Sequence, residues 1–203
     1  KDGIERHVIE KAGTPTMGGL VILAAALTGY LLRHVRAGVV FSDQTLIIIL
    51  GILVMAGLGL IDDLVKVRSH QNRGVYWKVK GLVSYLMDVG IAAILVTTTD
   101  IDTRISLTRA DLPGWDFGPV VWVFWAGMII FATTNAVNVT DGLDGLAAGS
   151  ALFGFIAFTG IAFWALRNPS IYGDVVNPYD LAVLAAAFAG ACAGFLWGNA
   201  APA

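Results

Sequence analysis

Six long apolar runs, separated by shorter polar connections, dominate the pattern of this 203-residue chain. Each run approaches the length of about 17–25 residues that crosses a bilayer as a helix. No ten-residue stretch alternates apolar and polar residues, which argues against a membrane barrel. The pattern therefore predicts an all-α, polytopic helical membrane protein. The expected spans are residues 15–32, 45–61, 79–99, 118–136, 146–166 and 181–198.

Composition supports the same class of protein. The chain is 57% hydrophobic and 14% charged, with a mean hydropathy of +0.74, values rarely met in a soluble domain. Its net charge of −2 gives no indication of a nucleic-acid partner. No repeat or low-complexity linker divides the sequence, so we interpret residues 1–203 as a single integral-membrane domain.

The basic residues predict an orientation. Six spans place the N-terminal segment, the connections 62–80 and 139–145 and the tail 199–203 on one side of the membrane. That side carries eight of the 13 Lys and Arg residues, and the opposite side carries five. The positive-inside rule therefore makes the first side cytoplasmic. We expect the connections on the outer side to hold no functional site, although residues 100–117 have room for a short hairpin or a surface helix.

Two adjacent carboxylates, Asp62 and Asp63, follow the second apolar run and are expected to end it. Carboxylates near hydrocarbon are costly and persist there when an ion, a phosphate or a proton needs them. Because neighbouring carboxylates repel, keeping both ionised favours a nearby cation, and oxygen ligands suit Mg²⁺. The simpler alternative is a polar helix end that faces water, for which one carboxylate suffices.

A second polar cluster follows the fourth run, with a polar residue at every third position. Its members are Asn135, Asn138, Asp141 and Asp144. Steps of three drift by about 60° around a helix, so the four cannot share one narrow face. Gly142 and Gly145 allow the chain to leave helical geometry at that point. We therefore expect a helix end that directs several oxygens to a ligand, whereas a capped helix end accounts for only two of the four.

Lysines accompany both clusters. Lys66, Lys78 and Lys80 share a connection with the aspartate pair, and Lys11 precedes a Thr-Pro-Thr-Met-Gly-Gly segment. Carboxylates, a metal and lysines at one surface suit a phosphoanhydride substrate, for which catalysis is largely positioning and charge neutralisation. The lysines could equally serve only the positive-inside bias.

Asp88 lies inside the third run, and we expect it to face the bundle interior with a hydrogen-bond partner. A proton relay at Asp88 is the basis of the non-enzyme alternative, a proton-coupled transporter. Two enzyme alternatives match less well. The segment from Asp141 lacks the arginine of CDP-alcohol phosphotransferases, and residues 57–62 miss the Gly-x-Gly-Asp register of intramembrane aspartyl proteases.

Four segments together resemble the phospho-N-acetylmuramoyl-pentapeptide-transferase family, the bacterial translocase I of the polyprenyl-phosphate N-acetylhexosamine-1-phosphate transferase superfamily. They are residues 11–19, 59–63, 135–147 and 195–203. The aspartate pair and the Asn/Asp cluster mark the superfamily. The Thr-Pro-Thr-Met-Gly-Gly segment and Asn-Val-Thr-Asp-Gly-Leu-Asp-Gly-Leu-Ala favour this branch, and the resemblance runs through the chain in order.

The resemblance implies a Mg²⁺-dependent transfer of phospho-N-acetylmuramoyl-pentapeptide from its UDP carrier to undecaprenyl phosphate. The products are lipid I and UMP, in the first membrane step of peptidoglycan synthesis. The implied partners are the two substrates and the lipid bilayer, and a homodimer is left open. The implied location is the bacterial cytoplasmic membrane, with the active site on its cytoplasmic face.

The resemblance also assigns residues. Asp62, Asp63 and Asp141 belong to the reaction centre, with Asp62 as the base toward the lipid phosphate and Asp141 at the metal. The positions assigned to substrate are Lys11, Thr16, Lys66, Lys78, Asn138, Gly142, Asp144 and Asn199. The lysines of the 62–80 connection face phosphates, Asn138 lines the nucleotide and metal site, and the others lie at or beside the uracil pocket. Direct transfer and a covalent phospho-aspartate intermediate both stay open.

The family pattern continues beyond this sequence. It runs on into a Met-Gly-Asp segment whose aspartate binds the metal, then into further helices and a histidine-rich loop. We therefore expect the chain to be C-terminally incomplete, with about six of the family's roughly ten helices and the main metal aspartate beyond Ala203.

Overall fold

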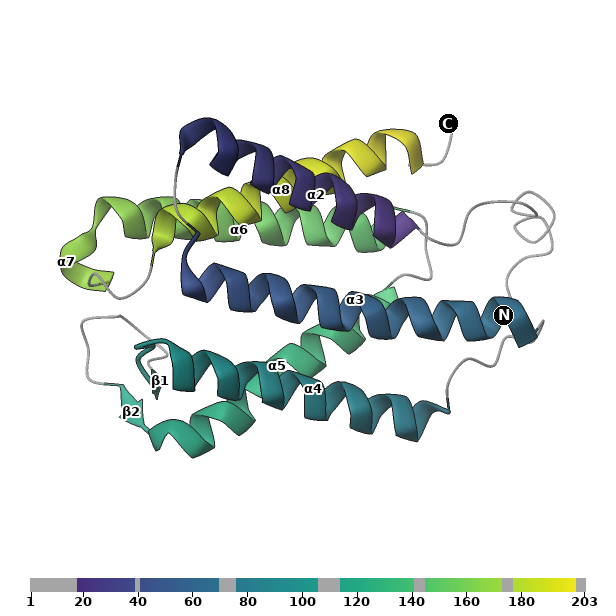
Figure 1. Ribbon diagram of the computed structural model, residues 1–203, viewed down its shortest axis with the longest axis horizontal. Helices are drawn as coiled ribbons and strands as arrows, with labels where there is room; N and C mark the ends of the chain where they lie inside the picture. Colours follow the sequence, from purple (N-terminus) through teal and green to yellow (C-terminus); the bar gives the residue numbers. More distant parts are fainter. Residues whose placement is uncertain are drawn as a thin grey trace.

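A computed structural model describes residues 18–38, 41–69, 76–105, 114–140, 145–172 and 177–199. Six long helices cross the structure in alternating directions, as Figure 1 shows. They are α2 (Gly18–Ala37), α3 (Asp43–Ser69), α4 (Trp77–Thr98), α5 (Gly118–Thr140), α6 (Leu146–Arg167) and α8 (Pro178–Asn199). Each is long and apolar enough to span a membrane. The predicted all-α, polytopic membrane fold is confirmed.

The helices extend beyond the apolar runs that predicted them. The aspartate pair does not end its segment, because α3 continues through Asp62 and Asp63 to Ser69. Likewise α5 runs through the first part of the Asn/Asp cluster to Thr140. Hydropathy reports only the part of a helix that lies in hydrocarbon. In α3 the residues Leu64, Lys66 and Arg68, which have good helix propensity, favour this continuation.

Small elements occupy the connections at one end of the bundle. Strands β1 (Arg104–Ile105) and β2 (Trp115–Asp116) pair antiparallel, which confirms the hairpin alternative for residues 100–117. The one-turn helix α7 (Pro169–Tyr172) follows α6 directly.

The long helices form two groups. In Figure 1, α2, α6 and α8 pack together in the upper part of the view, and α4 packs against α5 in the lower part. Between them α3 packs mainly against α4. The apolar core of the first group consists of Ala26, Tyr30, Leu184 and Phe188. Three isoleucines of α3 rest on that core, Ile48, Ile49 and Ile52. Thus α3 lies at the boundary of the two groups.

The contact between α4 and α5 depends on a glycine. A Cβ atom at Gly127 would lie 2.6 Å from Val89 Cγ2 and 2.9 Å from Val89 Cα. Neither distance is acceptable for non-bonded carbons, and the second partner is backbone. Small residues allow close approach of membrane helices in this way.

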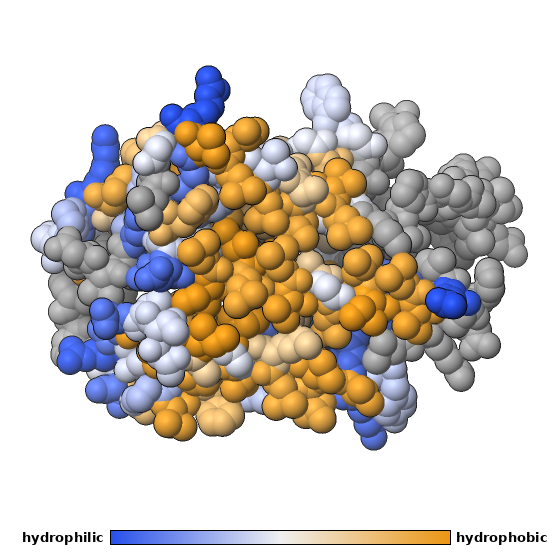
Figure 2. Space-filling view, in the orientation of Figure 1, coloured by the Kyte–Doolittle hydropathy of each residue, from blue (hydrophilic) through white to orange (hydrophobic). Residues whose placement is uncertain are grey.

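The lateral surface is apolar. Figure 2 shows hydrophobic residues across the middle of the visible face, with hydrophilic residues gathered mainly toward one end. Large exposed side chains on α6 alone include Phe153, Phe158 and Phe163. A soluble monomer rarely exposes so much contiguous apolar area, whereas a bilayer covers it.

Candidate active site

The predicted site residues that the structure describes lie near helix ends on one side of the molecule. The start of α2, the last turns of α3, the start of α4, the end of α5 and the end of α8 all lie toward the right of Figure 1. This follows from the topology, since six antiparallel helices bring alternate connections to the same end.

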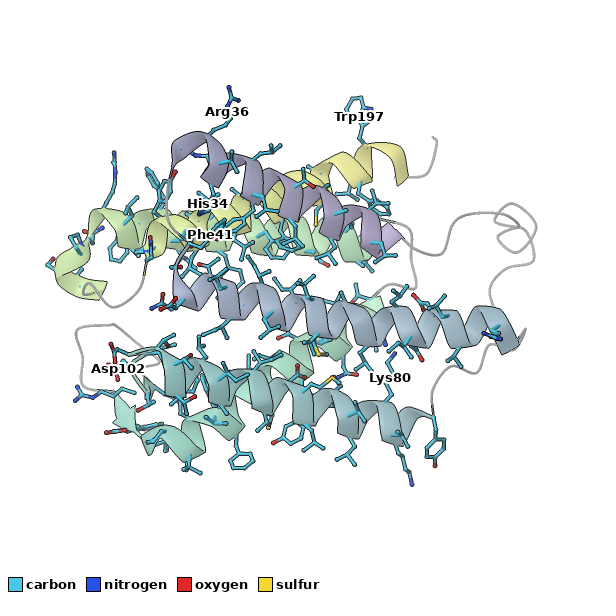
Figure 3. The ribbon with its side chains drawn as sticks, viewed as in Figure 1. His34, Arg36, Phe41, Lys80, Asp102 and Trp197 are labelled. Atoms are coloured by element: carbon cyan, nitrogen blue, oxygen red, sulfur yellow. The ribbon has the colours of Figure 1, made fainter. Side chains whose placement is uncertain are left out.

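The best-defined feature there is an ion pair between α3 and α4. Lys80 Nζ donates to Asp62 Oδ2 over 2.7 Å. Asp62 is only 4% exposed, and the Lys80 side chain is 26% exposed. Figure 3 shows Lys80 pointing from α4 toward α3. A charge-assisted bond of this length fixes one carboxylate oxygen and offsets much of the cost of burying the charge.

Lys80 was predicted only as one of the basic residues of the 62–80 connection and was not assigned to the site. The helical spacing of α4 contains the information that would have selected Lys80. Lys80, Ser84 and Asp88 are spaced four apart, so they share one face of α4, and the latter two are buried. Lys78 lies off this face and is exposed. This spacing could have identified Lys80 as a lysine that faces the bundle interior and can reach the aspartate pair.

The structure places four other predicted residues at this end. Asp63 is half-buried beside Asp62, and Asn138 is exposed near the end of α5. Lys78 lies in the first turn of α4, and Lys66 belongs to α3, although its side chain lies outside the described part. Asn138 continues the helix instead of leaving it. The predicted break comes later, where Gly145 adopts a left-handed φ of +74° just before α6.

Other predicted positions lie outside the described residues. These are Lys11, Thr16, Asp141, Gly142 and Asp144. Asn199 ends α8, but its side chain is not described. Their roles stay predictions. The segments that hold them adjoin described helices, because residues 11–17 lead directly into α2 and residues 141–144 connect α5 to α6.

The donor atoms present match the chemistry of Mg²⁺ but do not complete a site. Among the residues that the structure describes, no group of three His, Cys, Asp or Glu side chains could hold a metal. Asp62 and Asp63 supply hard carboxylate oxygens, and one oxygen of Asp62 is engaged by Lys80. Mg²⁺ is usually held by one or two carboxylates together with substrate phosphates and water. The aspartate pair therefore fits as part of such a site.

Asp88 faces the interior as predicted. Its side chain is fully buried, and Ser84 Oγ donates to Oδ2 over a long 3.4 Å. Within the described part of the chain, Oδ1 has no hydrogen-bond partner. The expected hydrogen-bond partner is therefore present, but the hydrogen bond that it makes is weak.

Comparison with known proteins gives two matches to family descriptions. The profile of glycosyl transferase family 4 matches residues 45–203, a range that includes the ion pair and the Asn/Asp cluster. Signature 1 of phospho-N-acetylmuramoyl-pentapeptide-transferase matches residues 11–23, which lead into and begin α2.

Curated relatives carry the same name. Proteins called phospho-N-acetylmuramoyl-pentapeptide-transferase are 38% identical in Streptomyces griseus and 40% identical in Frankia alni. Each similarity covers all of this chain and 60% of the relative. A Bifidobacterium longum protein of that name is 39% identical, again over the whole chain and 61% of its own length. The chain thus spans about 60% of the length of these relatives.

Proposed function

Because the chain belongs to glycosyl transferase family 4, we propose that it supplies the cytoplasmic reaction centre of a phospho-N-acetylmuramoyl-pentapeptide transferase. The resemblance predicted from the motifs is confirmed by the signature and the relatives. The proposed reaction joins phospho-N-acetylmuramoyl-pentapeptide, from its UDP carrier, to undecaprenyl phosphate. One structural observation supports the proposal independently of sequence similarity. The buried Asp62, paired with Lys80, lies at the same end of the bundle as the helix ends that adjoin the predicted substrate segments.

The lipid phosphate is the nucleophile in this proposal. One of its oxygens bonds to the sugar-bearing phosphorus of the UDP substrate, and the bond from that phosphorus to the bridging oxygen breaks, so that UMP leaves. A phosphate monoester has a second pKa of about 6 and is largely dianionic at neutral pH, so it needs little help from a base. The main task of Asp62 is then to orient the reacting groups.

Lys80 prepares Asp62 for that task. Its ammonium holds one oxygen of the carboxylate at 2.7 Å, which restricts the side chain before substrate arrives. A preorganised group avoids reorganisation at the moment of reaction, and phosphoryl transfer relies on such positioning and on charge neutralisation. The exposed Lys78 is proposed to meet the phosphates of the UDP substrate.

Mg²⁺, when bound, would neutralise charge on the diphosphate and help to align it. The residues of this chain proposed to hold it are Asp141 and the aspartate pair. Lys11, Thr16, Gly142, Asp144 and Asn199 are proposed to form or flank the uracil pocket.

Transfer can be measured directly on the protein at its full natural length, purified in detergent. With UDP-N-acetylmuramoyl-pentapeptide, undecaprenyl phosphate and Mg²⁺, we expect equimolar UMP and lipid-linked product. Removing Mg²⁺ with EDTA should stop both. Absence of both products from folded protein supplied with all three components would contradict the proposal and favour the transporter alternative.

A further inference from the structure

A second buried polar cluster lies at the opposite end of the bundle from Asp62. We call it the outer polar cluster. Its members are Tyr30, His34, Ser42, Thr45 and Asp180. Ser42 is half-buried and the other four are buried. Figure 3 shows His34 beside Phe41 at this end, and their rings stack with centroids 4.5 Å apart. The proposed reaction uses none of these residues.

Asp180 is the centre of the cluster and is fully buried. Tyr30 donates its hydroxyl to Oδ1 over 2.8 Å. Ser42 donates both its backbone N–H, over 2.9 Å, and its hydroxyl, over 2.8 Å, to Oδ2. His34 Nε2 lies 2.8 Å from Oδ1 but does not meet the geometry of a hydrogen bond among the described residues. A buried carboxylate with this many donors is held firmly in place.

Local sequence explains why these groups meet. Asn177 caps α8 by accepting the N–H of Asp180 over 3.2 Å, with Pro178 as the first helical residue. Ser42 similarly caps α3, because its hydroxyl accepts the N–H of Thr45 over 3.3 Å. The start of α8 and the start of α3 are therefore both fixed at their caps, and Asp180 joins them.

The cluster connects three helices across the boundary of the two groups. Tyr30 and His34 belong to α2, Thr45 belongs to α3, and Asp180 belongs to α8. Beyond the cluster, Ile48, Ile49 and Ile52 of α3 rest on the α2/α8 core, and α3 otherwise packs mainly against α4. At their other ends these same three helices lead to the proposed site. Asp62 lies on α3, Asn199 ends α8, and the signature segment enters α2.

We propose that Asp180 is a positioning residue, through which the outer polar cluster holds α3 in register with α2 and α8 and so places Asp62 against the substrate-binding ends of those helices. This inference rests on the proposed function. From Asp43 to Asp62, α3 is about 30 Å long at 1.5 Å per residue, so a tilt of roughly 2° at the cluster moves Asp62 by about 1 Å. A displacement of that size can cost about a hundredfold in rate.

A distance measurement tests the positioning role without reference to catalysis. The distance between spin labels at Leu64 on α3 and Trp197 on α8 measures where α3 lies relative to the α2/α6/α8 group. The distance between labels at Leu146 on α6 and Trp197 measures a separation within that group. All three positions are exposed. In Asp180→Ala we expect the first distance to shift or broaden by about 1 Å or more, while the second stays unchanged. An unchanged first distance would overturn the proposal.

Two further variants keep the test decisive. Ser42→Ala removes the hydroxyl link but keeps the backbone N–H, so it carries the measurement if Asp180→Ala does not fold. The matched control is Leu184→Ala, one turn further along α8, which removes apolar packing from the core on which Ile48, Ile49 and Ile52 of α3 also rest. It should lower the Tm but change the Leu64–Trp197 distance less than Asp180→Ala does, because the rest of that core stays in contact with α3. A comparable shift in Leu184→Ala would mean that Asp180 acts only through general stability, and would contradict the proposal.

Kinetics separate this proposal from the proposed function. In Asp180→Ala we expect kcat for transfer to fall by about tenfold to a hundredfold with little change in KM. Asp180→Asn keeps the shape and one acceptor oxygen, so it should recover part of the loss. If the wild-type protein shows no transfer at all, the proposed function fails while the distance result still decides the positioning role. Normal kcat in a folded Asp180→Ala variant would overturn the role in catalysis.

Discussion

Three carboxylates are buried among the described residues, and each is stabilised differently. Asp62 pairs with the ammonium of Lys80, and Asp180 accepts hydrogen bonds from Tyr30 on α2 and from Ser42, the cap of α3. Asp88 has only a long bond from Ser84. Burying an ionised group costs several kcal/mol unless partners offset it. Asp62 and Asp180 therefore have partners that make a charged form tolerable, and Asp88 does not.

We predict that Asp88→Asn is tolerated. The neutral amide avoids the cost of a poorly solvated carboxylate, so the Tm in detergent should be equal or higher and turnover should stay within about twofold of wild type. The measurement is thermal unfolding combined with the transfer assay. Loss of turnover in a folded Asp88→Asn variant would instead support the proton-relay hypothesis.

The two lysines at the start of α4 should behave differently. Lys80→Ala leaves Asp62 buried without its ammonium, and we expect a loss of about 3 kcal/mol in unfolding free energy together with loss of turnover. Lys78→Ala removes an exposed side chain and should mainly weaken UDP-substrate binding, by about 1–3 kcal/mol. Denaturation and substrate titration of both variants check this. Equal stability losses in the two variants would contradict the assignment of Lys80 as the inward lysine.

At the scale of elements, apolar runs predicted each membrane helix that the structure describes, because hydrocarbon thickness sets the length of such helices. The helix ends were less predictable. The polar residues that follow the apolar run of α3 continue the helix to Ser69. Lys80 could have been separated from Lys78 by the four-residue spacing to Ser84. The outer polar cluster could not be predicted, because Asp180 meets Ser42 and Tyr30 across 138 and 150 residues.

The packing of α4 on α5 makes a specific prediction about Gly127. Gly127→Ala places a methyl group against the backbone of Val89, so the two helices must separate. We expect a destabilisation of about 1–3 kcal/mol, as for other overpacked contacts. The matched control is Gly90→Ala on α4, where an added Cβ meets nothing within 4 Å. Comparable unfolding midpoints for the two variants would show that α4 and α5 do not depend on this close approach.

At the scale of the molecule, six antiparallel spans place the candidate site and the hairpin on opposite sides of the membrane. We predict that a cysteine at Arg68, on the last turn of α3, reacts with a membrane-impermeant maleimide only after permeabilisation. A cysteine at Asp102, before β1, should react in intact cells. Both residues are exposed, so accessibility within the fold does not limit either reaction. Labelling of both positions from outside would contradict the orientation.

The two helix groups also define how the site is assembled. Asp62, Lys80 and the predicted substrate residue Asn138 come from α3, α4 and α5. Asn199 ends α8 and the signature segment enters α2, both in the other group. A site shared between groups depends on their relative placement, and the outer polar cluster is well located to control it.

The most direct test of the central claim is kcat for lipid-linked product formation by Asp62→Asn, measured in the full-length protein at neutral pH. Asp141→Asn serves as a parallel variant and Asp88→Asn as the buried-carboxylate control. Each substitution keeps the size of the side chain, removes the charge and replaces one acceptor oxygen with an amide NH2. We predict that Asp62→Asn and Asp141→Asn lose turnover while remaining folded, and that Asp88→Asn keeps its turnover. Near-normal kcat in Asp62→Asn would contradict the claim that the Asp62–Lys80 end of the bundle is the reaction centre.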